Sequence, residues 1–135
     1  MPTSGFQIDN PLLDEDAAKL AQHTGCPIQI LRADDLVGVV VCGLALPAGI
    51  YNKATTDLLV QTTIQYPLSA MDMFWVDIDL TLATGAAPAG GESIESHFGR
   101  TWRRYSWHRN VPWVPGRDDL SSHYEFAVAR LQRPE

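Results

Sequence analysis

Apolar residues recur at every second position through the middle of the chain, which is the pattern of half-buried β-strands. The clearest case is 73–82, where Phe74, Val76 and Ile78 share one side and polar residues fill the other. Four segments carry this alternation or a run of β-branched residues: 28–31, 37–46, 57–66 and 73–82. Because turn residues separate them closely, we expect one four-stranded antiparallel meander.

Helical spacing of apolar residues appears instead near both ends of the chain. Segment 12–24 places Leu13, Ala17 and Leu20 on one face, and Gly25 is suited to end a helix there. Near the other end, Asp118 or Asp119 can cap a helix. Its apolar stripe consists of Leu120, Tyr124, Ala127, Val128 and Leu131. The two helices flank the predicted meander, so the fold class is α+β.

The remaining segments lack a regular pattern. Residues 1–11 contain two prolines and predict an extended lead-in, and the Gly- and Ala-rich residues 83–93 predict a flexible loop. Periodicity also fails over 94–114, which predicts a long irregular connection. The 135 residues are the size of a single domain, 1–135.

Charge and composition narrow the classes of function. The formal net charge is −6, yet seven of the ten basic residues lie from Arg100 onward. This balance argues against general nucleic-acid binding and suits a specific acidic partner. The apolar stretch 36–50 is interrupted by glycines and a proline, and no secretory signal is visible, so we expect a cytoplasmic protein without a membrane span. The two cysteines lack metal-site spacing, and we expect no metal or cofactor.

Two short motifs connect this order of elements with a known family. Tyr66-Pro67, followed by a strand from Phe74, resembles the flap of E2 (ubiquitin-conjugating) enzymes, and Trp113-Val114-Pro115 resembles the Trp-x-Pro that follows their active site. Residues 66–76, 99–102 and 117–120 resemble one branch in particular, prokaryotic E2 family E. The resemblance covers roughly residues 12–133.

That resemblance implies a UBC (E2)-like fold and a role in a bacterial ubiquitin-like conjugation system. The implied partners are a ubiquitin-like protein and its E1-like activating enzyme. An E2 normally carries its cysteine between the flap strand and Trp-x-Pro, but residues 84–112 contain none; the two cysteines are Cys26 and Cys42. The protein is therefore either a binding component without catalysis or a carrier that transfers the modifier through another residue. Its status as an enzyme stays open.

The cysteine-free interval offers substitutes for a catalytic site. Ser106 is a candidate nucleophile, His108 a base two residues later, and Asn110 a donor to an oxyanion. His97 lies where E2 enzymes carry a mainly structural histidine. The competing interpretation is an exposed loop serine with structural histidines.

Arginine and tryptophan are concentrated in the same interval and suggest a binding surface. The candidate partner-binding residues are Arg100, Trp102, Arg103, Arg104, Trp107 and Arg109. Some of these tryptophans are equally suited to pack the loop onto the core, with arginine stems over them. A binding module for anions or single-stranded nucleic acid is the alternative function. A serine hydrolase is disfavoured because no G-x-S-x-G pattern occurs.

Overall fold

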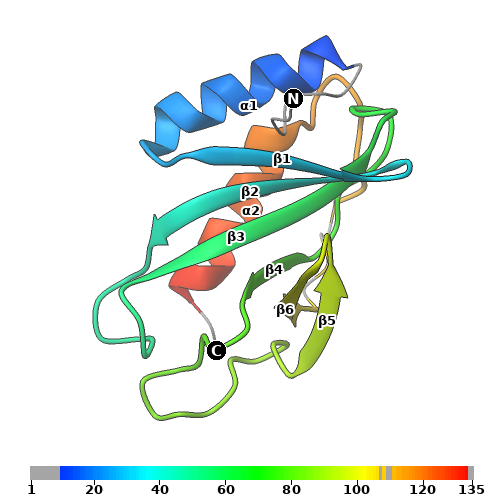
Figure 1. Cartoon of the computed structure of the whole chain (residues 1–135). Helices are drawn as coiled ribbons and strands as arrows, with labels where there is room; N and C mark the ends of the chain where they lie inside the picture. Colours follow the sequence, from blue (N-terminus) through cyan, green and yellow to red (C-terminus); the bar gives the residue numbers. More distant parts are fainter. Residues whose placement is uncertain (1–9, 107, 109–110, 134–135) are drawn as a thin grey trace.

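The computed structural model describes residues 10–106, 108 and 111–133. Two helices and a six-stranded antiparallel sheet make up this part of the chain (Figure 1). The elements are α1 Pro11–Thr24, β1 Ile28–Ala33, β2 Leu36–Ala45, β3 Thr55–Thr63, β4 Phe74–Asp77, β5 Ser93–His97, β6 Arg100–Tyr105 and α2 Leu120–Gln132. The α+β class is confirmed, but the sheet has six strands where the sequence predicted four.

Helix α1 begins inside the predicted lead-in. The side chain of Asn10 accepts a hydrogen bond from the Leu13 N–H, and Pro11 occupies the first turn, where its missing N–H costs nothing. Gly25, at φ 70°, ends the helix as predicted. The expected extended structure of residues 1–9 lies outside the described residues.

Strands β1, β2 and β3 lie where three of the four predicted strands were expected, and they pair in an antiparallel arrangement. The connection at Asp34-Asp35 reverses the chain, with Asp34 at φ 55°, and Val39 pairs with Ile30 on one side and Val60 on the other. A bulge interrupts β2 between Val41 and Leu44. Together these pairings build the central, best-buried part of the sheet.

Strand β4 is shorter than the predicted 73–82. It ends at Asp77 because the Leu80 N–H donates to the Asp77 carbonyl and closes a turn. Asn52 stabilises the turn: its side chain donates to the Asp79 carbonyl and accepts from the Thr81 N–H. Within the predicted segment 73–82, the strand therefore contains four residues, and Leu82 makes a separate bridge to Tyr51.

The predicted irregular connection 94–114 contains a β-hairpin, so that prediction was wrong over its first half. Strands β5 and β6 pair around Phe98-Gly99, both of which have positive φ. β6 inserts beside β4, which gives the strand order β1-β2-β3-β4-β6-β5. The alternate β5 side chains of Ser93, Glu95 and His97 are polar, and Glu95 contacts His97, so apolar periodicity does not reveal the strand.

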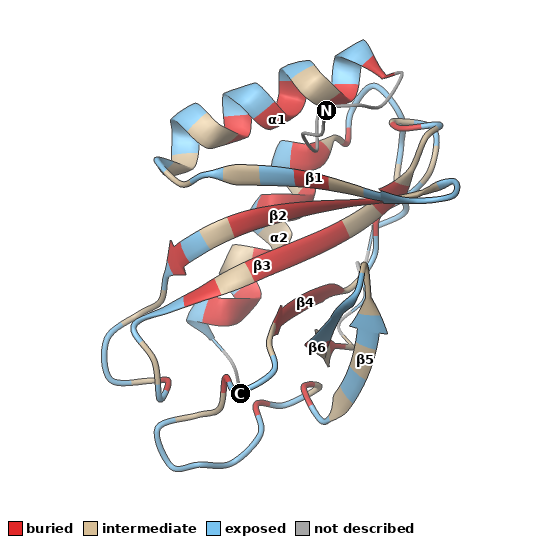
Figure 2. Cartoon of the chain, in the orientation of Figure 1, coloured by how far each residue is buried: buried red, intermediate tan, exposed pale blue. Residues whose placement is uncertain are grey.

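Both faces of the sheet are buried in its centre (Figure 2). The larger core lies between the sheet and both helices, with Leu13, Leu20 and Leu131 among its members. A second cluster on the opposite face contains Val40, Leu59, Trp75 and Trp102. Neither helix in the described part of the chain is long and apolar enough to cross a membrane.

Candidate functional site

The segment after β3 and the segment before α2 lie together at one end of the sheet. The Tyr66-Pro67 peptide bond is cis, and the motif lies just beyond β3, near the strand end where we predicted it. The Asn10 side chain donates to the Tyr66 carbonyl at 2.8 Å, and the Trp113 Nε1–H donates to the Pro67 carbonyl at 2.8 Å. The two motifs of the sequence resemblance are therefore in direct contact.

A cavity of about 190 Å³ lies between these two segments. Its lining is Ala70, Met71, Asp72, Val111, Pro112 and Trp113. Three large apolar side chains on the same segments are exposed: Leu68 (71%), Val111 (51%) and Val114 (42%). We call Leu68, Val111 and Val114 the apolar patch. The cavity and this patch form the candidate site.

His108 is the predicted site residue that reaches this cavity's lining. Its Nδ1 lies 2.6 Å from Oδ2 of Asp72, which lines the cavity. Both side chains remain open to solvent, at 65% and 45% exposure. A carboxylate bonded to Nδ1 fixes the ring and leaves Nε2 on the opposite side for chemistry.

Ser106 is held differently from the way we expected. Its Oγ accepts a hydrogen bond from Arg104 Nε at 2.9 Å, and its N–H donates to the Gly90 carbonyl. Its side-chain contact in the described chain is thus with a cation rather than with His108. The predicted oxyanion donor Asn110 lies outside the described residues.

His97 belongs to a separate cluster on β5. Its Nε2 lies 2.8 Å from Glu95 Oε1, and its ring packs edge-on against Trp75. Glu95 also accepts hydrogen bonds from the Trp75 indole and the Arg104 guanidinium. The hydrogen bond with His97, helped by that from Trp75, lowers the pKa of the Glu95 carboxyl. These contacts hold the His97 side chain against neighbouring residues of the sheet.

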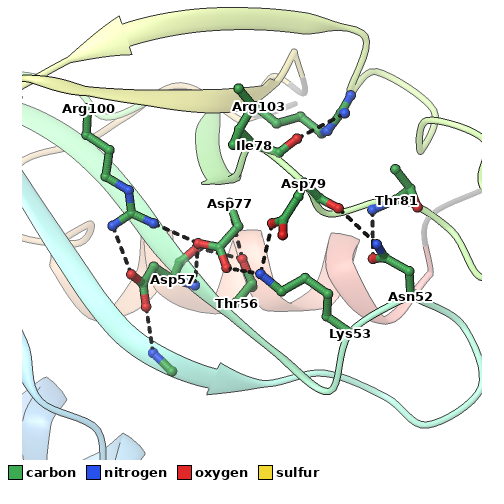
Figure 3. A network of polar contacts seen from close by, with 11 residues as sticks. Asn52, Lys53, Thr56, Asp57, Asp77, Ile78, Asp79, Thr81, Arg100 and Arg103 are labelled. Carbon is green, nitrogen blue, oxygen red and sulfur yellow. Dashed lines mark hydrogen bonds and ion pairs between the residues drawn. The ribbon is translucent and has the colours of Figure 1, made fainter.

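Arg100 is bound by two carboxylates of the sheet (Figure 3). Its guanidinium donates to Asp57 at 2.9 Å and to Asp77 at 2.8 Å. Lys53 completes the network by bridging Asp77 and Asp79. Hydrogen bonds to Asp77 and Asp79 raise the pKa of the Lys53 ammonium, and the bond from Lys53 lowers the pKa of Asp79.

The neighbouring arginines are also used within the chain. Arg103 donates to the Ile78 carbonyl (Figure 3) and to the Gly91 carbonyl, and so ties together the two ends of the loop before β5. Arg104 forms a salt bridge with Glu95. Trp102 is buried, with Arg100 stacked on its ring at 4.0 Å, so its position does not fit the predicted contact with a partner. Trp107 and Arg109 lie outside the described residues.

The two cysteines are free thiols: Cys26 lies just before β1, Cys42 lies in β2, and neither lines the candidate cavity. Cys26 packs against the core under the helices, whereas Cys42 packs against the cluster on the opposite face. Burial, with the nearby Asp57 carboxylate, raises the pKa of Cys42, which disfavours the thiolate. Among the residues described, no three His, Cys, Asp or Glu side chains converge as metal ligands.

Asp72 is the site residue that sequence reasoning missed. It lies 36 positions before His108 in the chain, and no motif joins the two residues. The available signal was indirect. Asp72 and His108 lie near the two motifs that the E2 resemblance brings together. A carboxylate near the flap was therefore a candidate partner for any histidine of the interval.

Comparison with known proteins supports the resemblance stated above. The model of prokaryotic E2 family E matches residues 12–134. Searches of curated proteins and of solved structures gave no match. The family match spans nearly the whole chain, including the flap, the hairpin and both helices. The chain therefore belongs to prokaryotic E2 family E.

Proposed function

We propose that this protein is an E2-like component of a prokaryotic ubiquitin-like conjugation system that works without a thioester of its own. It binds the ubiquitin-like protein or its E1-like activating enzyme. The observation that carries the proposal is the content of the segment between β4 and α2. In this E2-family chain that segment contains a hairpin and His108, which pairs with Asp72 just before β4, but no cysteine.

The apolar patch is the proposed contact surface. Val111 lines the cavity, and Leu68 and Val114 are exposed on the two segments that form it; exposed apolar residues at a concave site are typical of protein-binding surfaces. Arg100 and Arg104 are proposed as secondary contacts. Their guanidinium groups are partly exposed on the hairpin and can add a hydrogen bond to an acidic partner without leaving their present carboxylates.

Transfer through Ser106 is the second candidate. The Arg104 Nε–H donates to Ser106 Oγ, and a cation in that position stabilises a serine alkoxide. An ester on Ser106 would then replace the E2 thioester. The two candidates differ in whether the modifier becomes covalently attached to this chain.

The test is capture of partners from a lysate of the source organism supplied with ATP. Mass spectrometry identifies the captured proteins, and the intact mass of the tagged protein reports covalent attachment. We expect a ubiquitin-like protein or an E1-like enzyme to be enriched while the mass of the tagged protein stays unchanged. Leu68→Asp with Val114→Asp should reduce that enrichment about tenfold or more, because burying a carboxylate in an interface is costly.

Ile94→Asp is the matched control, since Ile94 is similarly exposed but lies on β5. An added mass equal to a small protein that disappears in Ser106→Ala would establish transfer through Ser106. Loss of the added mass in Cys26→Ser or Cys42→Ala would show that a cysteine carries the modifier. Capture of neither a ubiquitin-like protein nor an E1-like enzyme would exclude both candidates.

A further inference from the structure

A second cavity, of about 180 Å³, is formed by the β1–β2 turn, the end of β3 and the segment that follows β3. Its lining is mainly polar and consists of Asp35, Thr63, Ile64, Gln65 and Ser69. The Ile64 N–H donates to the Asp35 carbonyl at 3.0 Å. This backbone hydrogen bond fixes the two sides of the cavity relative to each other.

The groups that this cavity offers to a ligand are mainly hydrogen-bond acceptors. Asp35 is exposed, and the described structure records no ion pair or hydrogen bond for its carboxylate. The hydroxyls of Thr63 and Ser69 hydrogen-bond each other, and the Gln65 N–H already donates to Thr63 Oγ1 at 3.1 Å. A carboxylate beside amide and hydroxyl oxygens attracts a cation that carries several donors, and it repels an anion.

Among such cations, a guanidinium group suits the lining best. Its planar fork can donate two parallel hydrogen bonds to the Asp35 carboxylate while its other N–H groups reach neighbouring oxygens. A guanidinium is also less strongly hydrated than an ammonium, so it loses less when it enters a small cavity. Ile64 adds an apolar part to the wall, against which the methylene stem of an arginine can pack.

One short segment, 65–72, contributes to both cavities. Gln65 and Ser69 line the polar cavity, whereas residues 70–72 line the cavity of the candidate site. Leu68 of the apolar patch lies within this segment and is 71% exposed. A protein that covers Leu68 would therefore lie beside the polar cavity as well, and a basic side chain at its edge would find the Asp35 carboxylate.

We propose that the cavity at Asp35 binds the guanidinium group of an arginine side chain, presented by the protein that docks on the apolar patch. The inference rests on the proposed function, because that partner supplies the arginine. It adds the chemistry of the partner surface: an arginine beside an apolar contact, complementary to a chain whose net charge is −6.

The cavity can be tested with peptides in place of the partner. The probe is acetyl-Gly-Gly-Arg-Gly-Gly-amide, and its matched control carries citrulline, which has nearly the same shape as arginine without the charge. NMR titration of the isotope-labelled full chain follows the amide signals of Ile64, Gln65 and Ser69. We expect saturable shifts with the arginine peptide. The citrulline peptide should bind about tenfold more weakly, because it loses a charge-assisted hydrogen bond.

Substitutions in the chain locate the binding. Asp35→Asn should weaken binding of the arginine peptide about tenfold, for the same reason. Gln65→Glu adds a second carboxylate to the lining and should tighten binding about two- to fivefold. Asp34→Asn is the matched control and should leave binding unchanged. Asp34 is the adjacent exposed carboxylate of the same turn, it does not line the cavity, and asparagine tolerates its positive φ.

Equal binding of the two peptides, or equal effects of Asp35→Asn and Asp34→Asn, would overturn the proposal, provided that the amide spectra show folded proteins. A lysine peptide that binds as tightly as the arginine peptide would overturn the choice of a guanidinium. Tighter binding of free L-arginine than of the peptide would overturn the assignment to a protein partner and make the cavity a site for a small guanidino compound.

These outcomes are independent of partner capture, because the titration contains no ubiquitin-like protein or E1-like enzyme. Peptide binding without capture of either partner would refute the proposed function and leave the guanidinium site standing. Capture that is unchanged in Asp35→Asn, together with absent peptide binding, would refute the guanidinium site alone.

Discussion

Tyr66 connects three parts of the fold through a single hydroxyl group. Its Oη donates to Asp16 Oδ2 of α1 at 2.6 Å and accepts the Leu120 N–H of α2 at 2.7 Å. Both Tyr66 and Asp16 are buried. Because the cavity-lining residues 70–72 follow shortly after Tyr66, this hydroxyl fixes the cavity relative to both helices.

Replacing Tyr66 by phenylalanine should therefore destabilise the protein. The buried Asp16 carboxylate and the Leu120 N–H would each lose a partner, and we expect a loss of about 1–3 kcal/mol in the free energy of unfolding. Urea denaturation gives this value. Tyr124→Phe is the control: Tyr124 is also buried, but the described structure records no hydrogen bond for its hydroxyl, so the change should stay within about 0.5 kcal/mol. Equal effects of the two substitutions would contradict this role for Tyr66.

Single residues also show where sequence reasoning succeeds and where it stops. Gly25, Asp119 and the apolar spacing of α2 were predictable because helix ends and helix faces depend on local chemistry. Asp72 and Asp16 were not, since their partners are distant in sequence and are chosen by the tertiary fold. Of the Asp72–His108 pair at the candidate site, His108 was thus predicted from the sequence and its carboxylate partner was not.

At the scale of elements, the β5–β6 hairpin is the main departure from prediction. It joins the sheet through β6 and is anchored at its turn by Phe98, which lies over Gly38 of β2. The sequence carries little sign of this hairpin because Glu95, His97 and Arg104 satisfy one another where apolar residues would normally alternate. Polar pairing between strands therefore replaces the hydrophobic pattern on which strand prediction depends.

Gly38→Ala should show how tightly the turn of the hairpin is packed. A Cβ at this position would lie 2.5 Å from Phe98 Cε2 and 2.9 Å from Leu59 Cδ1, so side chains must move. We expect a loss of about 1–3 kcal/mol, typical of an overpacked site. Combined with Phe98→Ala, the cost of the added methyl group should become smaller, with a coupling of about 0.5–3 kcal/mol in thermal or urea unfolding. Strictly additive effects would mean that Phe98 does not occupy this position.

At the scale of the whole molecule, buried tyrosines set the response to alkaline conditions. Burial raises the pKa of four of them: Tyr51, Tyr66, Tyr105 and Tyr124. For Tyr66 and Tyr105, hydrogen bonds with Asp16 and Tyr51 add to that effect. In the unfolded chain a tyrosine titrates at a pKa of about 10. The native state therefore holds protons that the unfolded state has already released.

Stability should consequently be unaffected by these groups below about pH 10 and fall as the pH rises further. Each tyrosine that stays protonated in the native state contributes a slope of up to about 1.4 kcal/mol per pH unit. Urea unfolding at about pH 8 and about pH 11 measures the difference. Tyr66→Phe should reduce the slope, and an unchanged slope in that variant would show that Tyr66 ionises normally in the folded protein.

The order of the strands also has a consequence for synthesis of the chain on the ribosome. β4 is complete at Asp77, but β6, which pairs with its free edge, is not complete until Tyr105. At typical translation rates the intervening segment takes on the order of seconds to make. During that time the newly made β4 presents unpaired backbone groups along one edge, beside the apolar side chains of Phe74 and Trp75, and such an edge can pair with another chain. Because β4 has only four residues, the unpaired edge is short. A strand that stops at Asp77 thus limits association between chains during synthesis.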